Sequence, residues 1–426
     1  MAAGFWMLAA AGAAALAIWL TTAWLLDVAD DAPPGTDRAK IRVDAVRTGL
    51  AAGGGAGAAV GLMLAFRRQR HAELATALEQ LDAAERRITE LYNAAAEQLA
   101  SDKAPVRLTA LYTLERLAND NVRHQQTIVN IICAYLRMPY TPPPANRPDP
   151  EEEHRERARR NAARYRAARE LRHTPTEPQT QSPDPHEEHQ VRLTAQRLLS
   201  THLQPTAEHH WADISLDLTG ATLTNFTLSN CTLHHADFSN ATFSGVSTFD
   251  GATFSEDAEF DGATFSEDTW FVRATFSGVA RFDQVTFSGF AAFDEVTFSG
   301  VAVFGQVTFS RDAAFAQVTF SRDAWFVRPT FSGDALFAQA AFSGVAWFGE
   351  ATFSGSARFG EVTFSGAAKF GEATFSGVVE LGEAAFSSEG VDLEAAMVTD
   401  TGLGHQVPDG WRIGPTEGTQ GRFVRC

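Results

Sequence analysis

The sequence has little of what catalysis, disulfide bonding or nucleic-acid binding would need. It contains only three cysteines (Cys133, Cys231 and Cys426), which are too few for a disulfide framework and lack metal-binding spacing. No phosphate-binding glycine loop, nucleophile elbow or zinc-binding spacing occurs. The net charge of −17 gives the whole molecule no attraction to nucleic acid or anionic lipid. We therefore expect a non-enzymatic protein with no cofactor, no metal and no small-molecule substrate.

Charged residues are also missing from the start of the chain. Residues 2–26 contain none, and at about 1.5 Å per residue a helix of this length crosses a ~30 Å hydrocarbon core. A second apolar run, residues 48–66, is rich in Gly and Ala, which allow close helix packing. We expect a membrane anchor over residues 1–70, with helices at about 3–26 and 48–66 and a loop at 27–47. The alternative is that only the first run spans.

Basic residues favour a topology with both ends of the chain in the cytoplasm. Arg67, Arg68 and Arg70 directly follow the second apolar run, and such residues mark the cytoplasmic side of a membrane helix. Four basic residues in the preceding loop make the contrast modest. The sequence thus predicts a multi-pass protein of the inner (cell) membrane.

Residues 71–140 have the pattern of an all-α region. Apolar residues recur at heptad spacing over residues 74–99, interrupted once by Glu85. This is typical either of a coiled coil that pairs two subunits or of one long helix packed on its own domain. The string VRLTA occurs twice, at 106–110 and 191–195, each time in a segment with helical periodicity. Residues 141–185 are charged and then Pro-rich, which predicts a mobile linker.

The 32 phenylalanines need a structural reason, and their spacing supplies one. From Leu218 onward a large apolar residue recurs every five residues, and after Phe243 the spacing alternates between six and five as far as Phe386. The residue two positions before each is mostly Ala or Val. This period matches neither a helical face nor the alternation of a flat sheet.

This pattern resembles the pentapeptide-repeat family, whose motif A(D/N)LXX here has Phe in place of Leu. The resemblance covers about two fifths of the chain. It implies a right-handed quadrilateral parallel β-helix over residues 213–390, with the large residue and the small one before it inside. If two eleven-residue units make one coil, they replace the four five-residue units of the strict pattern, but the sequence leaves the number of residues per coil open. A solenoid needs covered ends, which we assign to a helical cap at 186–212 and a C-terminal cap with a hairpin at 391–426.

The fold class is therefore mixed: two N-terminal transmembrane helices, a small all-α region and a C-terminal β-helix. The order of the segments also resembles bacterial membrane-anchored pentapeptide-repeat proteins, a group with no established biochemical function. The resemblance rests on the two apolar runs, the repeats and three strings: AEQLASDKAPVRLTALYTLERLA, ICAYLRMPY and QVRLTAQRLL.

The residue before each six-spaced Phe should point outward, because its neighbour points in. If two eleven-residue units make one coil, every second such residue lies on the same side. One side then contains Val303, Trp325 and Trp347, and the opposite side contains Trp270 and Leu336. Exposed Trp rimmed by charge is typical of a protein-binding surface. The alternative is that these are ordinary surface residues, or that the helical region or a second subunit covers them.

The leading functional hypothesis is a membrane-tethered scaffold that presents a rigid β-helix to an unidentified protein partner. The alternative is an acidic mimic of DNA, since family members that protect gyrase from quinolones are acidic solenoids. Residues 237–389 hold 20 acids and seven bases, hence a charge of −13. The acids occupy scattered positions and the surface carries apolar residues, so the DNA-mimic function is not favoured. No direct binding of nucleic acid is expected. A homodimer through residues 74–99 or through a solenoid face remains open.

Overall fold

The computed structural model describes residues 2–30, 36–143, 185–388, 390–416 and 418–426. The chain divides into two compact units, Met1–Glu90 and Leu91–Cys426. Each unit is described by itself. The expected linker at 141–185 lies almost entirely outside the described residues.

The first unit consists of α1 (Ala2–Asp30) and most of α2 (Thr36–Leu99). The two helices approach closely at Gly49, where an added Cβ would lie 2.4 Å from Oγ1 of Thr22. Residues 36–47, expected as part of a loop, are helical, so that expectation is wrong. Ala, Arg and Lys are frequent in this segment and favour the helix. Among the described residues, no helix has both the length and the apolarity needed to cross a membrane.

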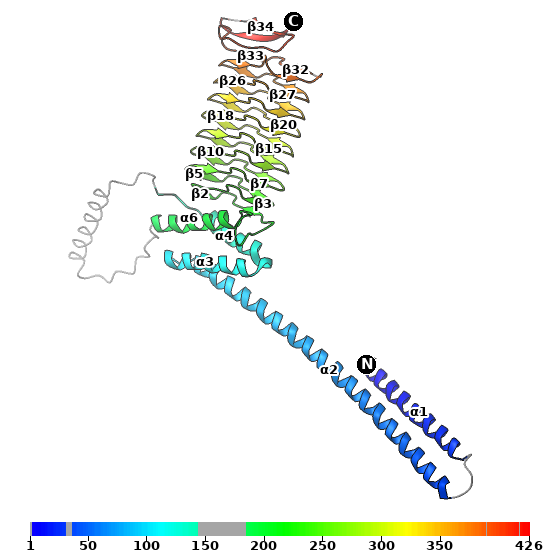
Figure 1. The fold of residues 1–426 in the computed structure, drawn as a ribbon. Helices are drawn as coiled ribbons and strands as arrows, with labels where there is room; N and C mark the ends of the chain where they lie inside the picture. Colours follow the sequence, from blue (N-terminus) through cyan, green and yellow to red (C-terminus); the bar gives the residue numbers. More distant parts are fainter. Residues whose placement is uncertain (1, 31–35, 144–184, 389, 417) are drawn as a thin grey trace, which may run out of the picture. The chain divides into compact units, whose positions relative to one another are not determined.

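The second unit begins with the last turns of α2, followed by three helices that we call the helical cap. These are α3 (Ala104–Asp120), α4 (Gln125–Arg137) and α6 (Pro185–His202). They lie together at one end of the β-structure (Figure 1). Their buried faces continue into the core of the first coils without a break.

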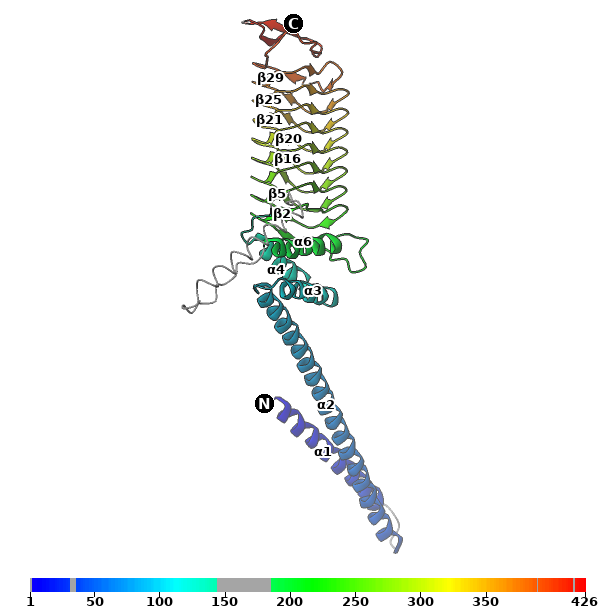
Figure 2. The ribbon, with the colours of Figure 1, turned by 90° about the vertical axis from the view of Figure 1, so that its left-hand side faces the viewer.

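The rest of this unit is a β-solenoid of about eight turns with parallel strands (Figures 1 and 2). One coil contains β16 (Ala302–Val303), β17 (Thr308–Phe309), β18 (Ala313–Ala314) and β19 (Thr319–Phe320), one strand on each side. The other coils repeat this arrangement, from β1 (Leu216–Asp217) to β33 (Met397–Val398).

The register of the strands gives the length of each coil. In the first coil Leu216 pairs with Ala236, four five-residue units later, as strict five-residue spacing requires. In the middle coils Phe287 pairs with Phe309, two eleven-residue units later. The longer coil arises because three-residue corners alternate with two-residue corners such as Gly305-Gln306, in which Gln306 has a left-handed φ of 53°. The middle coils therefore consist of two eleven-residue units, a length that the sequence left open.

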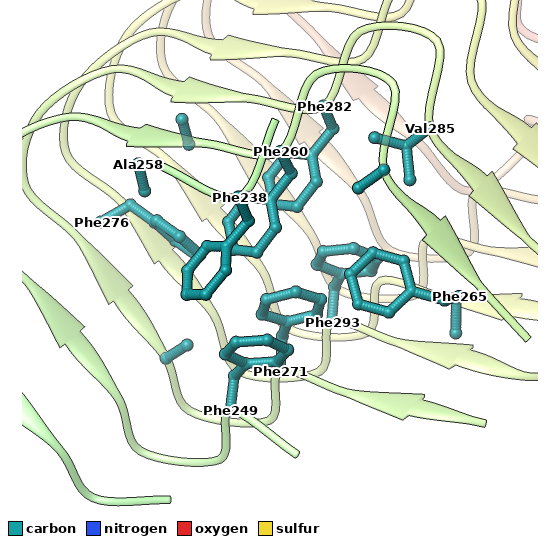
Figure 3. Close-up of a cluster of buried hydrophobic side chains, with 14 of the residues drawn as sticks. Phe238, Phe249, Ala258, Phe260, Phe265, Phe271, Phe276, Phe282, Val285 and Phe293 are labelled. Atoms are coloured by element: carbon teal, nitrogen blue, oxygen red, sulfur yellow. The ribbon is translucent and has the colours of Figure 1, made fainter. Parts of the chain in front are cut away.

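The core consists of ladders of stacked phenylalanine rings (Figure 3). Phe260 lies 4.8 Å from Phe282 between ring centroids, with the rings 3° from parallel. On the opposite side, Phe249 stacks on Phe271 at 4.6 Å. Rings from different ladders meet edge to face, as Phe249 and Phe260 do at 88°. Burial of each ring contributes roughly 1.5–3 kcal/mol, and both ring geometries are favourable for aromatic pairs.

Aspartate side chains connect successive coils at the corners. Each accepts a hydrogen bond at Oδ1 from a backbone N–H at the equivalent corner of the next coil. The nine aspartates that do so are Asp250, Asp257, Asp261, Asp268, Asp283, Asp294, Asp312, Asp323 and Asp334. These bonds satisfy corner N–H groups that the strands themselves do not pair.

Side-chain amides join the helical cap to the first coil. Gln126 of α4 donates through Nε2 to the carbonyl of Ser215 at 2.8 Å and accepts from the N–H of Ser215 at 2.9 Å. Gln196 of α6 makes the same pair of bonds with Thr224, both at 3.0 Å. A primary amide can replace the peptide group of a missing coil in this way, because it offers one donor and one acceptor side by side.

The C-terminal end is covered by a hairpin of β34 (Trp411–Pro415) and β35 (Gly421–Arg425). Strand β35 pairs antiparallel with β33, the last of the parallel strands in its sheet. Phe423 is buried against Phe375 at the end of a ladder, with ring centroids 5.9 Å apart.

Candidate protein-binding face

The outward residues of one side of the solenoid form a straight column. They lie in β8 (Ala258–Glu259), β12 (Ala280–Arg281), β16, β20 (Ala324–Trp325), β24 (Ala346–Trp347) and β28 (Ala368–Lys369). The register pairs each with the next, so the middle of the column consists of Glu259, Arg281, Val303, Trp325, Trp347 and Lys369. Asp237 of β4 (Ala236–Asp237) precedes these six residues in the column, and Asp392 of β32 (Val391–Asp392) follows them. We call this side of the solenoid the tryptophan face.

The middle of the tryptophan face is apolar and open to solvent. Trp325 is 48% exposed and Trp347 is 41% exposed, although their Cα atoms are paired in adjacent strands. A shallow hollow of about 420 Å³ lies beside Trp325, bordered by Val303, Val327 and Arg328. Large side chains with this exposure on a hydrogen-bonded sheet give a preformed surface, which loses little entropy on binding.

The ends of the column are charged. Arg281 donates to Glu259 at 2.9 Å, and the ammonium of Lys369 lies 4.8 Å from the ring centroid of Trp347. Both pairs are partly exposed, so each contributes little to folding. The apolar middle is thus followed at both ends by a basic residue, Arg281 or Lys369, and then by acidic residues, Glu259 and Asp237 at one end and Asp392 at the other.

Trp270 and Leu336 lie on the opposite side, in β10 (Thr269–Trp270) and β22 (Ala335–Leu336). Both are half-buried, and two strands of the sheet lie between them along the column. Trp270 packs edge to face against Phe290 at 5.5 Å. The five candidate residues therefore form one contiguous group, Val303 with the two exposed tryptophans, and two separate positions behind it.

A buried polar cluster in the helical cap was not identified from the sequence. Arg107 and Arg192 are both almost fully buried, and both pair with the carboxylate of Glu188, at 3.1 Å and 2.8 Å. Tyr135 donates to the same carboxylate at 3.0 Å. Burial, followed by the nearby Glu188 charge, raises the pKa of Tyr135 well above its usual range. The repeated string VRLTA was the signal, since its arginine is the residue used in both copies.

This cluster has the character of a structural element. The guanidinium of Arg192 also donates to the carbonyls of Leu136 and Met138, at 2.9 and 2.7 Å, and lies over the ring of Tyr140. Arg107 donates to the carbonyl of Ser101 at 2.6 Å. Together the two arginines hold the ends of α2 and α4 against α6.

The histidines near the cap have structural partners of the same kind. His202 pairs with Glu115 at 2.8 Å and stacks on the buried Trp211 at 4.4 Å, and Trp211 donates to Asn119 at 2.8 Å. Burial raises the pKa of Cys133 and of Cys231 to about 12, so both remain unreactive thiols at neutral pH. Within the described ranges, no three His, Cys, Asp or Glu side chains converge as metal ligands would.

The repeats match a known family. Four overlapping segments, residues 228–275, 238–286, 282–328 and 315–363, match the family model for pentapeptide repeats (9 copies). Comparison with curated proteins and with solved structures finds no match. The matched segments lie wholly within the solenoid, whose four parallel sheets and inward Phe and Ala columns agree with the motif. Residues 228–363 of the solenoid are therefore pentapeptide repeats.

Proposed function

We propose that this protein is a non-enzymatic, membrane-tethered scaffold whose rigid β-helix presents the tryptophan face to a protein partner. The observation that carries the proposal is that Trp325 and Trp347 occupy paired positions in adjacent strands and are both exposed. The sheet that holds them is hydrogen-bonded to further coils above and below. Trp is the side chain most enriched among residues that dominate binding energy. The hollow beside Trp325 can receive an apolar side chain of the partner.

Tethering is supported by the sequence at the start of the chain. Residues 2–26 carry no charge, and Arg67, Arg68 and Arg70 follow the second apolar run. We propose two transmembrane helices at about 3–26 and 48–66, in the inner membrane, with the solenoid in the cytoplasm. Reporter fusions after residue 70 and after Cys426 should both give a cytoplasmic signal. An exported signal from either fusion would overturn this topology.

The acidic residues support the scaffold over the DNA mimic. Nine of the 20 acids in residues 237–389 use an oxygen to bind the backbone of the next coil. They are therefore placed by the corners of the solenoid, and not in two rows resembling phosphates. A gyrase supercoiling assay separates the two functions, because dose-dependent inhibition by the purified chain would favour the mimic.

The heptad pattern of α2 gives a second route to association. Leu74, Leu78 and Leu81 are each more than half exposed, whereas Ala95 and Leu99 of the same pattern are buried in the core of the second unit. The last part of the pattern thus packs on its own domain. The first part is free to pair with another α2 helix, which we propose as a site of self-association separate from the solenoid.

The scaffold is tested by placing a photo-crosslinking amino acid at Val303 in the full chain, in cells. Crosslinked proteins are identified by mass spectrometry, then purified and titrated against the full chain in detergent. The double change Trp325→Ser and Trp347→Ser should leave the melting temperature unchanged and weaken binding at least about tenfold, as loss of a hot spot does. Trp270→Ser, on the opposite side, is the matched control. Equal affinities of the double variant and the wild type would end the proposal.

A further inference from the structure

The central column of the tryptophan face has an order that complements its own reversal. From one end it runs acidic, basic, apolar, apolar, apolar, basic, in six successive coils. We infer that the tryptophan face binds a second copy of this chain, with the two solenoids side by side and antiparallel. This inference rests on the proposed function, because it names the partner of the same face.

A two-fold axis between the layers of Val303 and Trp325 generates the pairing. Oligomers of identical chains are mostly closed by such an axis, which brings each residue of the patch against a different residue of the copy. Here Val303 meets Trp325 of the second copy at the centre. Arg281 meets Trp347, a favourable contact of a guanidinium with an aromatic ring. Glu259 meets Lys369, a pair of opposite charges.

The column beside the central one agrees with the same axis. It contains the corner residues one position before each small core residue: Asp257, Val279, Val301, Asp323, Val345 and Ala367. The antiparallel arrangement keeps this column opposite itself in reversed order. Val279 then meets Val345, and Asp257 meets Ala367. Within these six layers no two acidic side chains come together in either column, whereas one layer further out Asp237 of one copy lies across from Asp392 of the other.

A parallel arrangement of the same faces is unfavourable. Its axis would run along the solenoids, so that each residue of the central column meets itself. Glu259 would lie against Glu259 and Lys369 against Lys369, and the corner residue Asp257 would approach Asp261. Like charges placed against each other at an interface oppose association and select against that partner orientation.

The size of the face predicts a weak complex. Six layers at about 4.8 Å spacing extend over ~24 Å, and a single sheet face of this length buries less than a standard interface. We therefore expect reversible, concentration-dependent pairing, which confinement of both copies to one membrane would favour.

Crosslinking of the full chain in detergent tests the register directly. The background is Cys426→Ser, which leaves only the buried Cys133 and Cys231. Val279→Cys with Val345→Cys should give dimers with a bis-maleimide shorter than the ~14 Å that separates three layers of one chain. Peptides joining residue 279 of one copy to 345 of the other should be recovered. The matched control, Val246→Cys with Val345→Cys, places one thiol at an exposed valine on the opposite side and should give no such dimer.

A charge exchange provides an independent measurement. Glu259→Lys or Lys369→Glu alone should lower the yield of the 279–345 crosslink about tenfold, and both changes together should restore it. A parallel pair predicts no restoration, since each residue would still face its own kind. Absence of the 279–345 crosslink, or failure of the double exchange to restore it, would overturn the inference. If a photo-crosslinked partner still requires Trp325 and Trp347 in that case, the scaffold stands and only the identity of its partner changes.

Discussion

In the middle of the solenoid, Phe309 has the same kind of neighbours as the core residues of every adjacent coil. Glu188 in the helical cap has a set of partners that no other residue in the described chain shares. The first region is stabilised by many equivalent apolar contacts, and the second by a few polar contacts that depend on one another. In a repeated core, the destabilisation caused by one substitution is distributed over neighbouring coils. In a buried ionic cluster the destabilisation stays at the cluster, because each charged group needs the others to offset the cost of its desolvation.

The largest effect is expected from removing one ring of the repeated core. Phe309 is fully buried, with Phe287 and Phe331 stacked on either side at 5.1 and 4.9 Å. Phe309→Ala should lower the free energy of unfolding by about 3–5 kcal/mol, since the rigid ladder cannot close the cavity. Ser310→Ala, at the exposed corner next to it, should change it by less than about 0.5 kcal/mol. Equal shifts in melting temperature would mean that the side chain at 309 is not enclosed.

The cap should respond next, and locally. Glu188→Gln removes the charge that offsets Arg107 and Arg192 and should cost about 3 kcal/mol, as other broken buried ion pairs do. Hydrogen exchange should accelerate in α3, α4 and α6, while the central coils keep their protection. Glu187→Gln, at the exposed neighbouring position, is the control. Equal acceleration in the central coils would show that cap and solenoid unfold as one.

The joint between the two regions should show a smaller effect. Gln126→Glu keeps an acceptor for the N–H of Ser215 but leaves its carbonyl without the 2.8 Å donor. Loss of such a partly buried bond should cost about 1–2 kcal/mol. Gln190→Glu on the exposed side of α6 makes the same chemical change without a contact to the first coil. Hydrogen exchange at the first coil distinguishes them, and identical rates in the two variants would show that the amide does not cap the solenoid.

The two regions also differ in how far the sequence predicts them. Spacing alone located the Phe ladders, because every repeat follows the same local pattern. It placed Trp325 next to Trp347 only on the condition that two eleven-residue units make one coil, and the register meets that condition. The partners of Glu188 could not be predicted, since they come from three helices that only the tertiary structure brings together. The role of the corner aspartates lay between these cases. The acids were noted in the sequence as scattered, and their role was missed, because a carboxylate on a corner has the same sequence pattern whether it faces water or the next coil.

The smallest effect concerns those corner aspartates and their dependence on pH. Burial raises the pKa of Asp261 and Asp283 above the usual aspartate value of about 3.9, although each accepts a hydrogen bond from the next coil. The folded state therefore binds more protons than the unfolded state between the usual value and the raised one. This contribution stabilises the solenoid below that window and is lost as the pH rises through it.

Asn at both positions keeps an acceptor oxygen and removes the charge. The double variant should thus gain stability relative to the wild type as the pH rises from about 3.5 to about 7. Urea unfolding of both proteins at each pH measures this difference. A relative loss over the same range would mean that the charged form is the one the corner favours.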